Sequence, residues 1–333
     1  MAVSVKDVAA AASVSVGTVS NVLNRPDKVA PDTVARVLAA IDRLGFVRND
    51  AARQLRAGRS RSIGLIVLDS ANPFFAEVAR GAEERAAEHG ISVLLGNSDQ
   101  NPEREHAYLD LFREQRVNGV LLTPQELDEP RAAALAVVGV PVVLVDAELD
   151  SGRLPSVAVD DVEGGHLAAG HLLAQGRRRL AFVGPVAIRQ VADRLEGARR
   201  ALADVPDASL EVIECDALTV LQGREVGEAI AHRPVAERPD AVFCANDLLA
   251  VGVLQGASIL GSLRVPEEMA LIGYDDIDFA QSTVVPLSSV RQPARAIGAA
   301  AVDALFAALE DPDAAPRHVR FRPELVVRAS TAG

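Results

Sequence analysis

Tryptophan is absent from this 333-residue sequence, and cysteine and methionine occur only twice each. The two cysteines, Cys215 and Cys244, each lie in an apolar, strand-like run, and neither has a second cysteine or a histidine at metal-ligand spacing. We therefore expect buried free thiols rather than a redox pair or a metal site.

Long apolar runs are also missing. No stretch approaches the roughly 18 apolar residues that a membrane span needs, and the segment from Met1 to Val14 lacks the apolar core of a secretory signal. We therefore expect a cytoplasmic protein that does not contact a membrane. Apolar residues still make up 49% of the chain, which is enough for two or three folded units.

Charge is distributed unevenly along the chain. The net charge is −12, which by itself argues against a protein that binds nucleic acid. Residues 1–61, however, carry ten Lys and Arg against five Asp, a net charge of +5, so the remaining residues carry −17. A basic N-terminal part on an acidic body is the asymmetry expected if only that part meets phosphate groups.

Two short helices are predicted near the N-terminus. Ser4 and Asp7 form an N-cap with an acidic residue at position N3, which indicates a helix over residues 6–11. Ser15 caps a second helix over residues 16–23, after a tight turn.

A third helix completes this head. It is predicted to begin at Pro31, to repeat apolar residues at helical spacing and to end at Gly45. Three short helices in 45 residues, the first two joined by a tight turn, are typical of a helix-turn-helix DNA-binding domain. Residues 48–59 follow with helix propensity but almost no apolar face, so they predict either a solvated linker or a segment that folds only against DNA.

From Ser62 onward, apolar strands alternate with amphipathic helices, which predicts parallel sheets covered on both faces. The predicted strands are residues 63–68, 92–95, 119–123, 142–146, 157–160, 180–183, 212–215, 241–244 and 271–274. The predicted helices include residues 75–89, 103–115, 162–175, 194–203, 224–231 and 248–260. Nine such strands are too many for one compact sheet here, and residues 116–122 and 238–244 look like equivalent strands of two lobes.

A cleft between two such lobes would hold a ligand, because ligands of open α/β sheets bind at the carboxyl ends of the strands. Polar side chains follow the predicted strands at those ends: Asp69, Thr123, Asp146, Asn246 and Asp275.

A cytoplasmic sugar-binding protein or an enzyme on the same core fold is the alternative to a regulator. A transport-type binding protein would need a secretory signal and no DNA-binding head. The chain lacks a G-x-G-x-x-G turn, a phosphate loop, a G-x-S-x-G elbow and any triad-like histidine spacing, so we expect no catalytic residues, cofactor or metal.

The sequence resembles the LacI/GalR family of bacterial transcriptional regulators from Val5 to about Ser330. The residues that carry the resemblance are Lys6 to Ala9, Val14 to Asn24, Arg36 to Ile41, Ser62 to Ile66, Asn72 to Phe75, Ala245 to Asp247 and Ile272 to Asp276. The resemblance implies an all-α helix-turn-helix head on an α/β core like that of periplasmic binding proteins, built from two doubly wound parallel-sheet lobes and forming a homodimer.

Domain boundaries follow from this reading. We expect a DNA-binding domain over residues 1–48, a hinge over 49–61 and a ligand-binding core over 62–333. Lobe 1 would comprise about 62–161 and 292–322, and lobe 2 about 162–291 and 323–331.

The resemblance also implies how the head meets a palindromic operator in double-stranded DNA. The second helix would lie in the major groove, where Val16 and Asn21 read base edges, while Gly17 either permits close approach or is merely tolerated. Leu55 would enter the minor groove and kink the DNA, or else serve only as a contact between two hinges. The expected DNA-binding residues are Ser15, Val16, Gly17, Thr18, Ser20, Asn21, Asn24, Arg53, Leu55 and Arg56, with Arg59 as a further phosphate contact.

For the small-molecule effector, the resemblance points to a pocket whose polar groups suit a polyhydroxy ligand. Its expected residues are Asp69, Phe74, Phe75, Thr123, Asp146, Gln190, Arg194, Asn246 and Asp275. Acidic side chains argue against an anionic ligand, so we expect a neutral monosaccharide. The aliphatic Ile188 and Leu218 favour a deoxysugar, and without tryptophan any stacking on the ring falls to Phe74, Phe75 or Phe279. These residues together predict a repressor whose operator affinity depends on a sugar.

Overall fold

The computed structural model describes residues 3–46, 60–125, 128–137, 139–149 and 151–332. It divides into two compact units, Met1–Arg59 and Ser60–Gly333. No helix in the described ranges is long and apolar enough to cross a membrane.

The N-terminal unit is a three-helix domain, as predicted. Its helices are α1 (Val5–Ala11), α2 (Val16–Asn24) and α3 (Pro31–Leu44), with a 3₁₀ turn at Pro26–Lys28. Ser4 and Asp7 form the predicted capping box, and the side chain of Ser15 accepts a hydrogen bond from the backbone N–H of Thr18 at 3.0 Å. Gly45 ends α3 in the left-handed conformation, at φ 61°. The small core comprises Val8, Ala9, Ala12, Val19, Val22, Val37 and Ala40.

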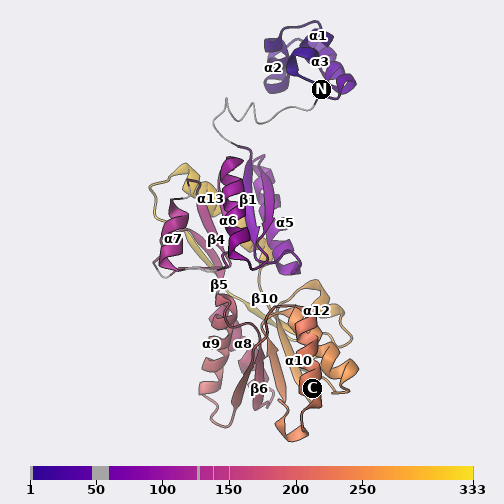
Figure 1. Cartoon of the computed structure of the whole chain (residues 1–333), viewed down its shortest axis with the longest axis vertical. Coiled ribbons are helices and arrows are strands. Elements are labelled where there is room, and N and C mark those ends of the chain that lie inside the picture. Colours follow the sequence, from indigo (N-terminus) through magenta and orange to yellow (C-terminus); the bar gives the residue numbers. More distant parts are fainter. Residues whose placement is uncertain (1–2, 47–59, 126–127, 138, 150, 333) are drawn as a thin grey trace. The chain divides into compact units, whose positions relative to one another are not determined.

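The second unit contains two six-stranded sheets (Figure 1). The first has the order β2-β1-β3-β4-β5-β11, and all of its pairs are parallel. Its strands are β1 (Ser62–Val67), β2 (Ser92–Asn97), β3 (Val120–Leu122), β4 (Val142–Val145), β5 (Ser156–Val159) and β11 (His318–Phe321). Within it, Leu65 lies between Leu95 of β2 and Leu121 of β3.

The second sheet repeats this order as β7-β6-β8-β9-β10-β12, with β12 antiparallel to β10. Its strands are β6 (Arg179–Val183), β7 (Ser209–Ile213), β8 (Ala241–Cys244), β9 (Ala270–Asp275), β10 (Ser288–Arg291) and β12 (Glu324–Val326). Two lobes with the same strand order place two equivalent switch points in one unit, between β1 and β3 and between β6 and β8.

Helices cover both faces of the first sheet. They are α5 (Pro73–Glu88), α6 (Pro102–Glu114), α7 (Glu129–Ala136) and α13 (Ala294–Glu310). Successive residues of β1 serve opposite faces: Leu65 belongs to the core under α5 and α13, and Ile66 to the core with Phe112 of α6. This alternation explains why β1 carries apolar side chains on both of its faces.

Helix pairs pack against the second sheet on both sides (Figure 1). The helices are α8 (Asp161–Ala174), α9 (Arg189–Ala203), α10 (Val220–His232), α11 (Asp247–Leu254) and α12 (Asp278–Ser282), with a π-helical segment at Gln255–Leu260 and a 3₁₀ turn at Val235–Glu237. Glycines let the paired helices approach closely. A Cβ on Gly165 of α8 would lie 1.9 Å from the carbonyl oxygen of Arg194 on α9.

Three strands and three helices were not among the predicted elements: β10, β11, β12, α7, α12 and α13. The prediction also placed β7 at residues 212–215, whereas the strand runs from Ser209 to Ile213. This strand lies at the edge of its sheet and includes the partly exposed Glu211, so it does not read as an apolar run. Helix α9 begins five residues before its predicted start, and its N-cap, Ile188, makes no side-chain capping bond that would mark this start in the sequence.

Candidate functional site

The outer face of α2 carries the predicted base-reading residues. Val16 is 42% exposed, and Gly17 and Asn21 are also exposed. A Cβ on Gly17 would meet only the hydroxyl oxygen of Ser15, at an ordinary 3.6 Å, so the fold of the head does not require glycine there. Arg53, Leu55, Arg56 and Arg59, the other predicted DNA contacts, lie outside the described residues.

The remaining predicted residues of this helix make local hydrogen bonds. The hydroxyl oxygens of Ser15 and Thr18 lie 2.9 Å apart, and the amide of Asn24 donates to the carbonyl oxygen of Ser20 at 2.8 Å. These bonds stabilise the two ends of α2. Val16, Gly17 and Asn21 form the exposed surface of the helix that is available for contact with DNA.

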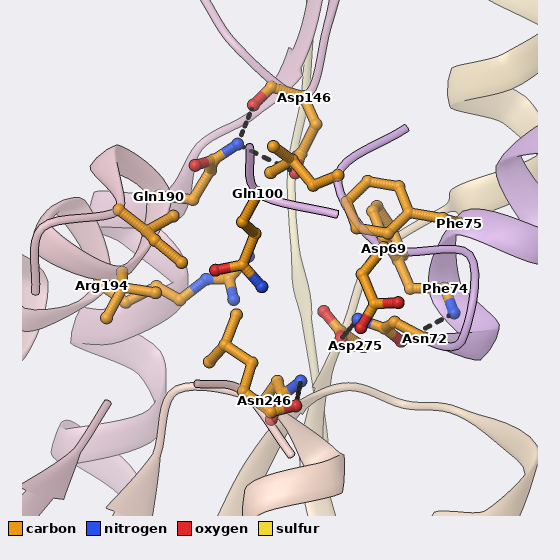
Figure 2. Close-up of a pocket in the computed structure, with 14 residues that line it drawn as sticks. Asp69, Asn72, Phe74, Phe75, Gln100, Asp146, Gln190, Arg194, Asn246 and Asp275 are labelled. Atoms are coloured by element: carbon orange, nitrogen blue, oxygen red, sulfur yellow. Dashed lines mark hydrogen bonds between the residues drawn. The ribbon is translucent and has the colours of Figure 1, made fainter. Parts of the chain in front are cut away.

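A cavity lies between the two lobes of the second unit, where the carboxyl ends of both sheets meet (Figure 2). Its lining, called the effector cavity below, consists of Leu68, Asp69, Asn72, Phe74, Phe75, Gln100, Asp146, Ile188, Gln190, Val191, Arg194, Leu218, Asn246 and Asp275. The space between these side chains is about 480 Å³ including the part open to solvent. The enclosed cavity volume is about 40 Å³.

The structure brings eight of the nine predicted ligand residues to this cavity. Thr123 does not line it: the residue follows β3 and is completely buried. Phe279 is 59% exposed and lines a neighbouring crevice instead. The prediction omitted Asn72 and Gln100, which lie in loops after β1 and β2, although Asn72 belongs to a motif that was recognised.

Arg194 enters the cavity from α9 and is held on three sides. Its Nε donates to Asp161 at 2.8 Å, its Nη1 donates to the carbonyl oxygen of Ala245 at 2.7 Å, and its guanidinium carbon lies 3.7 Å from the centre of the Tyr274 ring. Burial alone would lower the pKa of Arg194, but the nearby negative charge, chiefly that of Asp161, outweighs it and raises the pKa. The guanidinium therefore stays charged and fixed.

Two carboxylates of the cavity are bound by amides that bridge the lobes. Gln190 donates to the backbone oxygen of Asp146 at 2.7 Å and to its carboxylate at 3.3 Å. Asp275 accepts from Asn72 at 3.3 Å and from Gln292 at 2.7 Å. The bonds Gln190–Asp146 and Asn72–Asp275 each join one lobe to the other (Figure 2).

Acceptors outnumber cations in this cavity. Asp69, Asp146 and Asp275 line it, whereas the charge of Arg194 is already balanced by the buried Asp161. One oxygen of Asp146, Oδ1, is buried without a hydrogen-bond partner. Burial, followed by the charge of Asp161, raises the pKa of Asp146 well above its usual value. Such a site favours a ligand that donates hydrogen bonds and disfavours an anion.

Asp275 should make stability depend on pH. Burial raises its pKa from 3.8 to about 6, so the folded state holds this proton more tightly than the unfolded state. Stability should then fall as pH rises from 4 to 7, by about 3 kcal/mol for this group. In urea unfolding at a series of pH values, Asp275→Asn should lose correspondingly less stability over that range than the wild type. Parallel profiles for the two proteins would contradict the assignment.

The two cysteines are free thiols, as predicted. Cys244 is buried, whereas Cys215 is only half-buried because β7 ends two residues before it. Burial raises the pKa of Cys215 to about 11 and also raises that of Cys244, so both thiols are protonated at neutral pH.

Comparison with known proteins identifies relatives of both units. Residues 4–49 match the family described as bacterial regulatory proteins, lacI family, and residues 169–331 match a periplasmic binding protein-like domain. HTH-type transcriptional repressor PurR from Aliivibrio fischeri is 34% identical, over 98% of this chain and 97% of the relative.

Solved structures agree with these matches. The lac repressor dimer bound to operator and the anti-inducer ONPF has a TM-score of 0.85 at 27% identity and covers 100% of both chains. A LacI family transcriptional regulator from Enterococcus faecium with bound ribose has a TM-score of 0.73 at 25% identity, over 81% of this chain and 98% of that one. The chain therefore belongs to the lacI family of bacterial regulatory proteins and is a DNA-binding transcriptional regulator with an effector-binding core.

Proposed function

We propose that this regulator is a repressor whose operator affinity is modulated by a neutral monosaccharide in the effector cavity. The observation that carries the proposal is the fixed Arg194 guanidinium beside the carboxylates of Asp146 and Asp275. Sugar hydroxyls can donate to carboxylates and accept from a guanidinium at the same time. The ribose bound to the related Enterococcus faecium protein supports a sugar as the effector, whereas the name of the Aliivibrio fischeri protein supports only the role of repressor.

Ligand entry would change the contact between the lobes. The enclosed volume of about 40 Å³ is little more than the roughly 30 Å³ that one water takes up and is too small for a monosaccharide, so the lobes or the lining side chains must move to admit one. Separation of the lobes would break the bridges Gln190–Asp146 and Asn72–Asp275 and replace them with bonds to the ligand. The effector would thereby bias the arrangement of the two lobes, which is how binding would reach the DNA.

Calorimetry with a panel of sugars tests this function. The panel comprises D-ribose, D-xylose, D-glucose and the deoxysugar L-fucose, and the apolar side chains of Ile188 and Leu218 favour the last. At least one sugar should bind and should change operator affinity about 5- to 150-fold. If only a purine, a phosphorylated sugar or another anion binds, the proposal of a neutral sugar fails, although the regulator assignment stands.

Exposed apolar side chains on the core support a homodimer. Leu95 on the edge strand β2 is 53% exposed, Leu221 on α10 is 63% exposed and Ile259 is 62% exposed. Isolated surface leucines are common, but large exposed apolar side chains on both lobes suit a contact between copies. The dimer would present two heads to a palindromic operator. A sedimentation mass of one chain at micromolar concentration would contradict it.

Operator recognition is proposed to depend on Asn21, because its side chain is exposed on α2 and an Asn amide can bond adenine through two hydrogen bonds. Asn21→Ala should cost about 1 to 3 kcal/mol on the preferred site and relax the preference at one base pair in each half-site. Selection from a random-site library measures both effects.

Asn24→Ala is a matched control for this experiment. It can lower overall affinity, but it should leave base preference unchanged because the amide of Asn24 is bonded to Ser20. If Asn21→Ala selects the same sites as the wild type, Asn21 does not read a base.

A further inference from the structure

The protein engages two of the three guanidinium nitrogens of Arg194. Asp161 engages Nε, Ala245 engages Nη1, and the ring of Tyr274 covers one face. These contacts leave Nη2 as the nitrogen that neither partner occupies. Arg194 is 4% exposed, and Figure 2 shows its guanidinium reaching toward the centre of the effector cavity. The direction of Nη2 therefore determines which ligand hydroxyl this nitrogen can meet.

The start of α8 provides the support for this arrangement. Asp161 is the first residue of α8, and Gly164 and Gly165 follow one turn later. A Cβ on Gly164 would lie 2.1 Å from the hydroxyl oxygen of Tyr274, and a Cβ on Gly165 would lie 1.9 Å from the carbonyl oxygen of Arg194. Any side chain at these two positions must displace the ring or move α9. One turn of helix thus fixes the ion-pair partner, the ring and the backbone that orient the guanidinium.

We propose that Asp161, Gly164, Gly165 and Tyr274 are positioning residues for effector recognition: they fix the direction of the Arg194 guanidinium and thereby the hydroxyl pattern that the cavity accepts. None of the four is among the described residues that line the effector cavity. The proposal rests on the proposed function in one respect, namely that the effector bonds to Arg194.

The competing role for Asp161 is simple neutralisation of a buried cation. Both side chains of the ion pair are nearly inaccessible, at 5% and 8% exposed, so a counter-charge is required in any case. The two roles differ in how closely the position of the carboxylate must be kept. Neutralisation needs only a carboxylate near Arg194, whereas positioning needs the carboxylate at the distance from the backbone that an aspartate side chain gives.

Asp161→Glu separates these two roles. It keeps the charge but moves the carboxylate by one methylene, so positioning predicts a roughly ten- to hundredfold loss of affinity for the tightest-binding sugar of the panel defined above. Asp161→Asn, which keeps a short acceptor but removes the charge, should lower the unfolding temperature more than Asp161→Glu does. Wild-type sugar affinity in a folded Asp161→Glu protein would overturn the proposal.

Variants of the glycines in α8 test whether the close approach of this helix to α9 and to the Tyr274 ring orients Arg194. Gly165→Ala should lower sugar affinity at least tenfold at temperatures where the variant is folded, because α9 must shift. Gly170→Ala is the matched control on α8, since a Cβ there would meet no atom within 4 Å, and it should bind sugar as the wild type does. Adding Tyr274→Phe to Gly164→Ala should restore part of the affinity, because it removes the nearest clashing atom. Equal affinities in Gly165→Ala and Gly170→Ala would contradict the proposal.

A third measurement does not depend on the ligand. In protein labelled with ¹⁵N-arginine, the Nε–H of Arg194 should give a slowly exchanging resonance displaced by the ring of Tyr274, identified by its absence in Arg194→Lys. The chemical shift of this resonance should change in Asp161→Glu and Gly165→Ala and should stay the same in Gly170→Ala. If no sugar binds the wild type, the proposed function fails, and this resonance then tests separately whether the four residues fix the direction of the guanidinium. An unmoved resonance in Asp161→Glu and Gly165→Ala would overturn it.

Discussion

Raising the salt concentration from 50 to 200 mM should weaken operator binding by roughly 10³- to 10⁵-fold. The reason is the basic N-terminal part: ten Lys and Arg within residues 1–61 of each chain, or twice that number in a dimer. A dimer that neutralises 6 to 10 phosphates would release their counterions and lose affinity on this scale. In the described head, Lys6, Arg25, Lys28, Arg36 and Arg43 are all exposed and able to reach phosphates.

Fluorescence anisotropy with labelled operator DNA over a salt series measures the slope. Sugar binding by the same protein is the internal control, because a neutral ligand in the effector cavity releases no counterions. The sugar Kd should therefore change little over the same range. A flat titration of operator binding would contradict the division into a basic head and an acidic body.

Arg194→Ala should abolish measurable sugar binding and lower the free energy of unfolding by about 3 to 5 kcal/mol. Both effects follow from the loss of the Arg194 guanidinium. The variant removes the cation of the effector cavity, and it leaves Asp161 buried without its partner. Calorimetry with the sugar panel and urea unfolding measure the two effects separately.

Two further variants make this result interpretable. Arg199→Ala removes an exposed arginine from the same helix and should change neither quantity by much. Arg194→Ala with Asp161→Asn should recover part of the lost stability, since no unpaired charge remains, but should not recover sugar binding. Wild-type sugar affinity in Arg194→Ala would remove this residue from the effector site.

The sequence predicted those elements that bury a regular apolar face. Strand β8 was placed at its observed bounds, because all four of its residues are buried and apolar. Strands β11 and β12 were not predicted, since they are short, largely exposed edge strands with charged residues such as Arg320 and Glu324. The periodicity of apolar residues reflects burial. It therefore does not reveal an edge strand that is held mainly by backbone hydrogen bonds to its neighbour.

Prediction of the candidate site was limited in a different way. Residues directly after predicted strands, such as Asp146 and Asp275, could be placed at one edge because parallel strands end there together. Asp161, in contrast, is the first residue of α8 and reads as an ordinary acidic residue in the first turn of a helix. Its contact with Arg194 joins two residues that lie 33 positions apart on different helices, and a single sequence carries no local signal of such a contact.

The order in which the strands leave the ribosome matters for this fold. The first sheet contains β11 and the second contains β12, and both strands lie after residue 317, whereas the other five strands of each sheet precede residue 292. Neither lobe can therefore complete its sheet until residues 318–326 have been synthesised. In a nascent chain, β5 waits as an open sheet edge from its own synthesis until His318 and β10 waits for a shorter time, and a chain cut before His318 would leave both edges open for good. For this regulator, the exposure of unfinished sheets to chaperones and to other nascent chains ends with the translation of one short segment, residues 318–326.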